Sequence, residues 1–238
     1  MPWDFVLILL FFAIAVPLLG RRRIRRLLAS PETTKQDRLA LYASTIVFQW
    51  VAVAIILWRA RTHNISLAEL GVNFSSPILT VGVAVSLTAL VLGNQIVALK
   101  RLSIDVHEAQ GQLQQVAIRI FPQEATERIA FSLLVLTVAI CEEFIFRGFF
   151  QRVFTTWAGN VAIVGIIGSA ALFAISHLYQ GRKGVIVTFV VGILFSAIRA
   201  WTGNLIPSGT AHFCADLIVG LMAPASIRAA AGQAKASE

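Results

Sequence analysis

Charged side chains are scarce in this sequence: Asp, Glu, Lys and Arg together make up 13% of its 238 residues. A soluble domain carries about a quarter charged residues. Here 57% of the residues are apolar, and they gather in long blocks with few charges between them. Blocks of about 18 or more such residues are typical of membrane-spanning helices. The shortage of charge excludes an ordinary soluble domain and indicates an integral membrane protein.

Cysteine is also nearly absent, since only Cys141 and Cys214 occur and both lie in apolar blocks. Two cysteines in such positions imply no disulfide framework, and they are interpreted as small packing residues. Acidic residues are fewer than basic ones, 12 against 20, which gives a net charge of +8. The basic residues concentrate in short segments between the blocks, above all in Arg21–Arg26. This pattern follows the positive-inside rule and predicts a membrane lipid environment, with no nucleic-acid partner; binding of anionic lipid is a secondary interpretation.

The blocks predict an all-α fold, a polytopic transmembrane helical bundle that forms a single membrane domain over residues 1–238. About seven spans are expected, with eight as the alternative. The expected spans are 3–19, 41–58, 77–98, 128–150, 159–179, 184–201 and 206–223. The loops after the first, third and fifth spans hold most of the Lys and Arg residues. This asymmetry predicts a multi-pass protein of a bacterial inner membrane or its equivalent, with the N-terminus outside and the C-terminus cytoplasmic. The polar segment 102–126 is expected to form an amphipathic helix on the membrane surface.

Two carboxylates and a guanidinium interrupt the fourth span, in the stretch "AICEEFIFRG" at 139–148. A charge at bilayer depth costs about 2.5 kcal/mol or more, so it needs a partner or a watery cavity. Glu143 and Arg147 are four residues apart and share a helix face, which predicts an ion pair. A purely structural role for this pair is equally compatible with the spacing. Glu142 lies about 100° round the helix and gains no local cation, as expected for a general base.

Two later spans add imidazole and carboxylate groups. His177 closes the fifth span, and His212 and Asp216 share a face of the seventh. Three spans thus send acid, base or imidazole groups inward, which favours activation of water for hydrolysis. The same residue types bind zinc, although the one-helix spacing of zinc peptidases is missing. Intramembrane Glu and His also serve proton relays, and a single histidine near a span end is often an interfacial residue.

Three motifs in this order are similar to those of the CPBP family, which includes CAAX prenyl endopeptidases and bacteriocin-processing or immunity proteases. They are "EEFIFR" at 142–147, "FAISH" at 173–177 and "HFCAD" at 212–216, and "RGFFQ" after the first strengthens the likeness. The resemblance covers about residues 120–223, which it implies to be the catalytic core. It implies an intramembrane endopeptidase that cleaves a peptide or protein substrate at the membrane, with a prenylated CAAX protein as one candidate. The alternatives are a non-catalytic scaffold or immunity protein and a proton-coupled transporter.

The resemblance also implies roles for single residues. Glu142 and His177 would activate the attacking water, while His212 and Asp216 would stabilise the oxyanion or complete a metal site. If zinc were the cofactor, its ligands would be Glu142, His177 and His212. The remaining motif residues, Glu143, Arg147 and Phe173, would support these groups. Asp216 stands where many members have Asn, and its charge beside an oxyanion favours a metal, a proton on Asp216 or a weaker oxyanion hole.

The expected boundaries place these groups at different depths. His177 falls near the cytoplasmic end of its span, whereas Glu142 and His212 fall toward the other side of theirs. Catalysis needs these groups within hydrogen-bond reach. The spans must therefore be staggered, or the boundaries must shift by a turn or more, or the groups must share a cavity.

Overall fold

The computed structural model describes the backbone of residues 2–30, 32–73, 76–104 and 112–236. The described residues contain helices and no strand, which confirms the all-α prediction. In chain order the helices are α1 (Trp3–Leu10), η1 (Phe11–Ala15), α2 (Val16–Ala29), α3 (Lys35–Thr62), α4 (Pro77–Ile104), α5 (Gln112–Ile120), α6 (Ala125–Glu142), η3 (Glu143–Phe150), α7 (Gln151–Trp157), α8 (Ala162–Ser176), η4 (Leu178–Gln180), α9 (Gly181–Thr202) and α10 (Ile206–Ala236).

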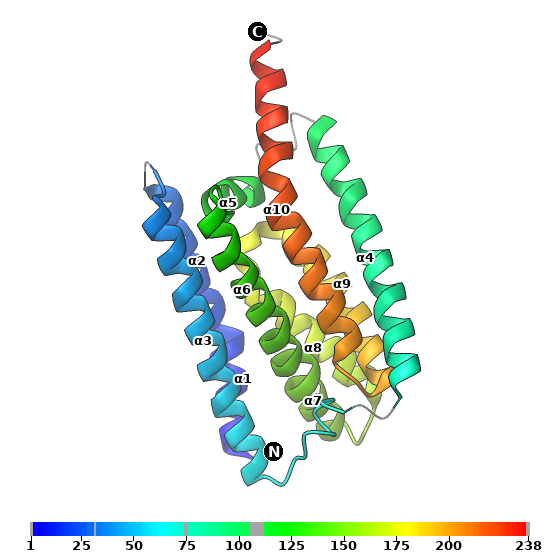
Figure 1. Ribbon diagram of the computed structural model, residues 1–238. Coiled ribbons are helices and arrows are strands. Elements are labelled where there is room, and N and C mark those ends of the chain that lie inside the picture. The colour runs from blue at the N-terminus through cyan, green and yellow to red at the C-terminus, as the bar shows by residue number, and fades with distance from the viewer. Residues whose placement is uncertain (1, 31, 74–75, 105–111, 237–238) are drawn as a thin grey trace.

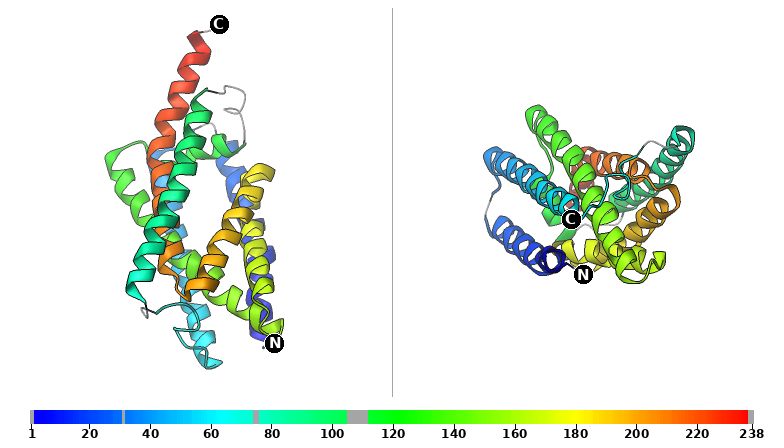
Figure 2. Two further views of the ribbon diagram at one scale, coloured as in Figure 1. Left: turned by 90° about the vertical axis from the view of Figure 1, so that its right-hand side faces the viewer. Right: turned by 90° about the horizontal axis from the view of Figure 1, so that it is seen from below.

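The long helices lie side by side along one axis, and the two chain termini lie at opposite ends of the bundle (Figure 1). Helix α10 packs on α4, α8 packs on α9, and α3 packs on α6. The view from below in Figure 2 shows the helices gathered around α6 and α10. Many large apolar side chains remain exposed on the outside of the bundle, including Ile78 at 90%. Because a lipid bilayer would cover such side chains, the surface agrees with a helical membrane bundle.

Five helical segments of the described chain are long and apolar enough to cross a membrane. They are Trp3–Ala29, Lys35–Thr62, Pro77–Val97, Ala125–Trp157 and Leu178–Thr202. The fifth and seventh predicted spans fall on shorter apolar helices, Ala162–Ser176 and Ile206–Met222. A bilayer core needs about 20 helical residues, so within the described residues five of the about seven expected spans have full length and two coincide with shorter apolar helices.

The predicted boundaries are too narrow where a helix continues past its apolar block. The first helical segment runs on through Arg21–Arg26 to Ala29, and the fourth continues from residue 150 to Trp157. Arg and Leu are good helix formers, so the helix continues after hydropathy has fallen. Of the predicted surface helix 102–126, residues 112–120 form α5, and 105–111 lie outside the described residues.

A π-helical segment, η3, interrupts the fourth apolar segment at the predicted ion pair. All eight of its residues are buried, among them Phe144, Phe146, Phe149 and Phe150. The Ser169 hydroxyl of α8 donates to the Phe146 carbonyl at 2.7 Å, which satisfies a backbone group inside the bundle. Stretches of π-helix are rare and often occur at functional sites.

Apolar clusters surround this segment. Phe5, Ile56 and Phe149 belong to a cluster that joins the N-terminal helices to η3 and α8. A second cluster joins α4, α9 and α10 around Phe195, and a third joins α3 to α6 around Phe131. The segment η3 follows α6 directly and packs on α8, so the polar residues at the α6–η3 junction lie among these apolar clusters.

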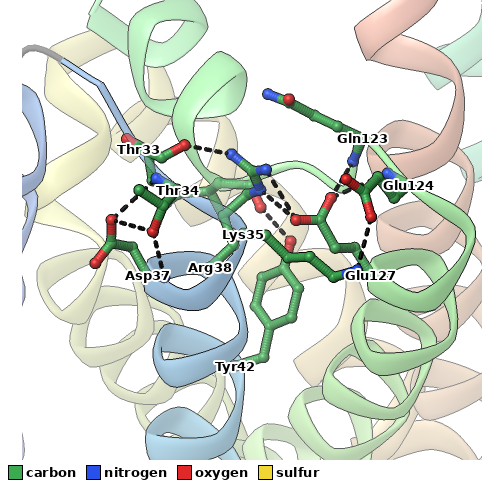
Figure 3. A network of polar contacts seen from close by, with 10 residues as sticks. Thr33, Thr34, Lys35, Asp37, Arg38, Tyr42, Gln123, Glu124 and Glu127 are labelled. Atoms are coloured by element: carbon green, nitrogen blue, oxygen red, sulfur yellow. Dashed lines mark hydrogen bonds and ion pairs between the residues drawn. The ribbon is translucent and has the colours of Figure 1, made fainter.

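A buried polar network fixes the start of α3 beside the start of α6 (Figure 3). Arg38 Nε donates to Glu127 Oε1 at 2.9 Å, and both side chains are almost completely buried. Glu127 Oε2 also accepts the backbone N–H groups of Gln123 and Glu124 at the N-terminus of α6. Every carboxylate oxygen of Glu127 is thus bonded, as a buried charge requires. The network sets the register of α3 against α6.

We expect Gly148→Ala to destabilise the protein by about 1–3 kcal/mol, the range for an overpacked core. A Cβ atom on Gly148 would lie 2.8 Å from the backbone carbonyl oxygen of Leu70. The matched control is Gly82→Ala in α4, where a Cβ would meet nothing within 4 Å. Thermal unfolding in detergent compares the two variants. Equal melting temperatures for the Gly148→Ala and Gly82→Ala proteins would contradict this packing explanation.

Candidate active site

Glu142 ends α6 inside the bundle, with one bonded and one unbonded oxygen. Its Oε1 accepts a hydrogen bond from Gln49 Nε2 of α3 at 3.1 Å, and both residues are buried. Its Oε2 is buried and has no hydrogen-bond partner among the described residues. Burying a carboxylate oxygen without a hydrogen bond costs free energy. This oxygen is therefore available to accept a hydrogen bond from a water or a substrate.

His177 follows the last residue of α8 and faces Glu142. Its Nδ1 lies 2.8 Å from the Phe173 carbonyl oxygen one turn earlier. A carbonyl can only accept, so Nδ1 carries the proton and Nε2 is the other, free nitrogen. His177 Nε2 lies 4.0 Å from Glu142 Oε2. This distance is too long for a direct hydrogen bond and suits a bridging water.

His212 enters from α10 and contacts three carboxylates. Its Nδ1 lies 3.0 Å from Glu143 Oε1. Its Nε2 lies 3.4 Å from Asp216 Oδ2 and 3.9 Å from Glu142 Oε2. The Glu143 contact orients the ring, so that Nε2 points to the same atom as His177 Nε2.

Arg147 is completely buried and forms the predicted pair with Glu143, with NH1 3.0 Å from Oε1. Its guanidinium carbon lies 4.1 Å from the centre of the Phe173 ring and 5.4 Å from that of Phe195. Aromatic faces at these distances stabilise a buried cation. Glu143 Oε1 therefore joins Arg147 to His212, and Phe173 contacts both the guanidinium and the two imidazoles.

The structure thus brings together every residue of the three motifs that the sequence analysis selected. They come from the α6–η3 junction, the end of α8 and the first turns of α10. Asp216 is the outermost of them, with 46% of its side chain exposed. The groups that the expected boundaries placed at different depths meet in the structure, since both histidines lie within 4.0 Å of Glu142. Glu142 lies near the middle of the Ala125–Trp157 segment, and α8 has only 15 residues before His177.

The comparisons with known proteins identify the segment that holds these motifs. Residues 124–218 match the family model of Rce1-like, type II CAAX prenyl endopeptidases. This segment is similar to the Rce1-like family, and the match spans less than half of the chain. The match confirms the resemblance to the CPBP family, and it lies within the predicted core 120–223.

One curated protein to which this chain is similar is the uncharacterized protein YpbD of Bacillus subtilis (strain 168). It is 30% identical over 102 residues, which cover 42% of this chain and 48% of YpbD. The chain therefore spans about half the length of the curated relative that it matches. No solved structure matches the chain.

Gln49 is the residue of the site that the sequence analysis missed. It lies in α3, outside the Rce1-like match, in a span predicted only from its hydropathy. The available signal was its amide in the middle of the apolar stretch "IVFQWVAVAII", because polar side chains inside a membrane need partners.

The donor types around Glu142 suit zinc, but their arrangement does not. Two imidazole nitrogens and a carboxylate oxygen are a common zinc ligand set. Even so, the described residues contain no group of three or more His, Cys, Asp or Glu side chains that could hold a metal ion. The hypothesis of a zinc site at Glu142, His177 and His212 gains no support from this geometry.

Proposed function

We propose that this protein is an intramembrane endopeptidase that hydrolyses a peptide bond of a membrane-associated substrate. The observation that carries the proposal is the convergence of two imidazole Nε2 atoms, from α8 and α10, on the unpaired Oε2 of Glu142. The Rce1-like match supports the same reaction class.

Glu142 and His177 are the proposed water-activating pair. A water between them faces two acceptors, the unbonded Oε2 of Glu142 and the Nε2 of His177, whose Nδ1 carries the ring proton. It donates one hydrogen to each, and its oxygen lone pair is left to attack the scissile carbonyl carbon. Glu142 takes the proton as the C–O bond forms, and later delivers it to the leaving amine.

His212 and Asp216 are the proposed oxyanion side of the site. In the imidazolium form His212 donates through Nδ1 to Glu143 and through Nε2 toward the substrate. A donor aimed at the developing charge stabilises the tetrahedral intermediate. Asp216 Oδ2 lies 3.4 Å from His212 Nε2, so the positive charge of the imidazolium offsets the negative charge that would otherwise oppose the oxyanion.

The substrate class and orientation belong to the same proposal. We infer a peptide anchored by a lipid, with a prenylated CAAX protein as the first candidate, because the Rce1-like match is to CAAX prenyl endopeptidases. The distribution of Lys and Arg supports a cytoplasmic C-terminus in a bacterial inner membrane or its equivalent.

The test is cleavage of quenched peptides by the purified protein in detergent. A farnesylated CAAX peptide, its unprenylated counterpart and an unrelated hydrophobic peptide form the panel, and mass spectrometry locates the cleaved bond. Each reaction is run with and without a zinc chelator. Cleavage that needs the farnesyl group supports the prenyl substrate. Failure to cleave the whole panel by a folded protein would contradict the proposed reaction.

We expect Gln49→Leu to lower kcat tenfold or more and to leave KM nearly unchanged. A hydrogen bond to a charged group contributes about 1.5–3 kcal/mol, and Gln49 orients Glu142 without facing the substrate. Gln36→Leu, an exposed position on the same helix, is the matched control. Steady-state kinetics on the cleaved peptide separate the two constants. A rise in KM alone would assign Gln49 to substrate binding instead.

A further inference from the structure

A cavity of about 190 Å³ lies beside Arg147, and Glu142 is not among the residues that line it. Its lining comes from η3 and α7, from the first residue of α8 and from the end of α9. The lining residues are Arg147, Gln151, Arg152, Thr155, Ala162, Arg199 and Ala200. Helix α7 and the N-terminus lie at the same end of the bundle, away from the C-terminus (Figure 1).

Hydrogen-bond donors without partners concentrate around this cavity. Arg147 is completely buried, and its Nε and NH2 atoms have no hydrogen-bond partner among the described residues, while its NH1 forms the ion pair with Glu143. The Nε atom of Arg199 is also buried without a partner. The unbonded acceptor among the lining residues is Gln151 Oε1. Buried polar atoms are normally paired. The unpaired guanidinium N–H groups that line the cavity therefore favour a ligand that accepts hydrogen bonds.

The cavity also has an excess of positive charge. Arg147 is paired with Glu143, and Arg152 NH2 lies 2.7 Å from Glu69 Oε1. The hydrogen bond from Arg152 lowers the pKa of Glu69 to about 2, so this carboxylate is ionised at neutral pH. Arg199 donates from NH2 to the backbone carbonyl of Glu69 at 2.8 Å and has no carboxylate partner among the described residues. One guanidinium therefore lacks a counter-ion.

We propose that this cavity, between Arg147, Arg152 and Arg199, is an oxyanion site that binds a phosphate group. Guanidinium groups bind phosphate oxygens through paired N–H donors. The N-terminus of α8 at Ala162 adds further N–H groups and a positive partial charge. The volume is below that of a drug-sized pocket and suits a single phosphate, either free or in a phospholipid headgroup. The proposal is independent of the protease activity.

Thermal unfolding of the purified protein in lipid-free detergent tests the site. The probes are inorganic phosphate and dihexanoyl phosphatidylglycerol, each compared with chloride at the same ionic strength to remove general screening. Binding raises the melting temperature by mass action, by about 3 °C or more at ten times the dissociation constant. The probe that acts at the lower concentration identifies the source of the phosphate group.

Three variants make the test specific. Arg199→Gln removes the cation without a counter-ion, and Ala200→Glu places a competing carboxylate on the cavity wall. Both are expected to abolish the shift. Arg61→Gln, an exposed arginine at the end of α3, is the matched control and is expected to keep it. Absence of a shift in the wild type with both probes, or a shift that persists in a folded cavity variant, would overturn the proposal.

Discussion

Replacing Glu142 by glutamine is expected to lower the cleavage rate at least about a hundredfold, the usual contribution of a general base. The amide keeps the shape of the side chain and can still bond to Gln49, but it cannot take a proton from water. The substitution removes the basic oxygen Oε2, which has no hydrogen-bond partner among the described residues of the wild-type protein. Initial rates on the cleaved peptide, with melting temperatures beside them, measure both effects.

Glu32→Gln is the matched control for this substitution, because Glu32 is exposed near the start of α3. We expect it to leave both rate and melting temperature unchanged. A folded Glu142→Gln protein that cleaves at the wild-type rate would remove Glu142 from the mechanism. A transporter or a scaffold would then be the better interpretation of the buried charges.

The second large effect is expected on stability, from Glu143→Gln. Arg147 is completely buried, and Glu143 is its ion-pair partner at 3.0 Å. Removing one partner of a buried pair leaves an uncompensated charge and costs about 3–5 kcal/mol. The melting temperature in detergent should therefore fall much further than for Glu142→Gln, which breaks no ion pair with an arginine.

A double variant separates the structural role of this pair from its role in the site. Glu143→Gln with Arg147→Met removes both charges and keeps the volume apolar between Phe173 and Phe195, so most of the lost stability should return. Activity should stay low, because His212 Nδ1 has lost the carboxylate that orients it. Recovery of activity together with stability would show that the pair serves packing alone.

The polar groups of the site were predictable from the sequence because the membrane makes each of them conspicuous. In an apolar chain, Glu142, His177 and His212 stand out, and their order matches three motifs of one family. The Glu143–Arg147 pair followed from the four-residue spacing. These inferences depend on residue type and local geometry, which a single sequence contains.

The other features of the site depend on how the helices pack against one another, and hydropathy does not predict this packing. The contact of His177 with Glu142 did not follow from the expected boundaries, because an apolar block does not show where α8 ends relative to α6. The π-helical turn at Glu143 has no clear composition signal. Gln49 was missed because its partner lies 93 residues away in the chain, and the long-range register that joins them is set by the Arg38–Glu127 network.

The buried bond between Arg38 and Glu127 limits how this fold can be divided. Glu127 belongs to the Rce1-like segment, whereas Arg38 belongs to α3, which lies outside it. If residues 120–223 were excised or moved into another membrane scaffold, Glu127 would lose its buried partner Arg38. Glu142 would lose its hydrogen bond from the amide of Gln49. We therefore expect that the segment matched by the family model does not fold on its own, and that an active chimera needs α3 as well.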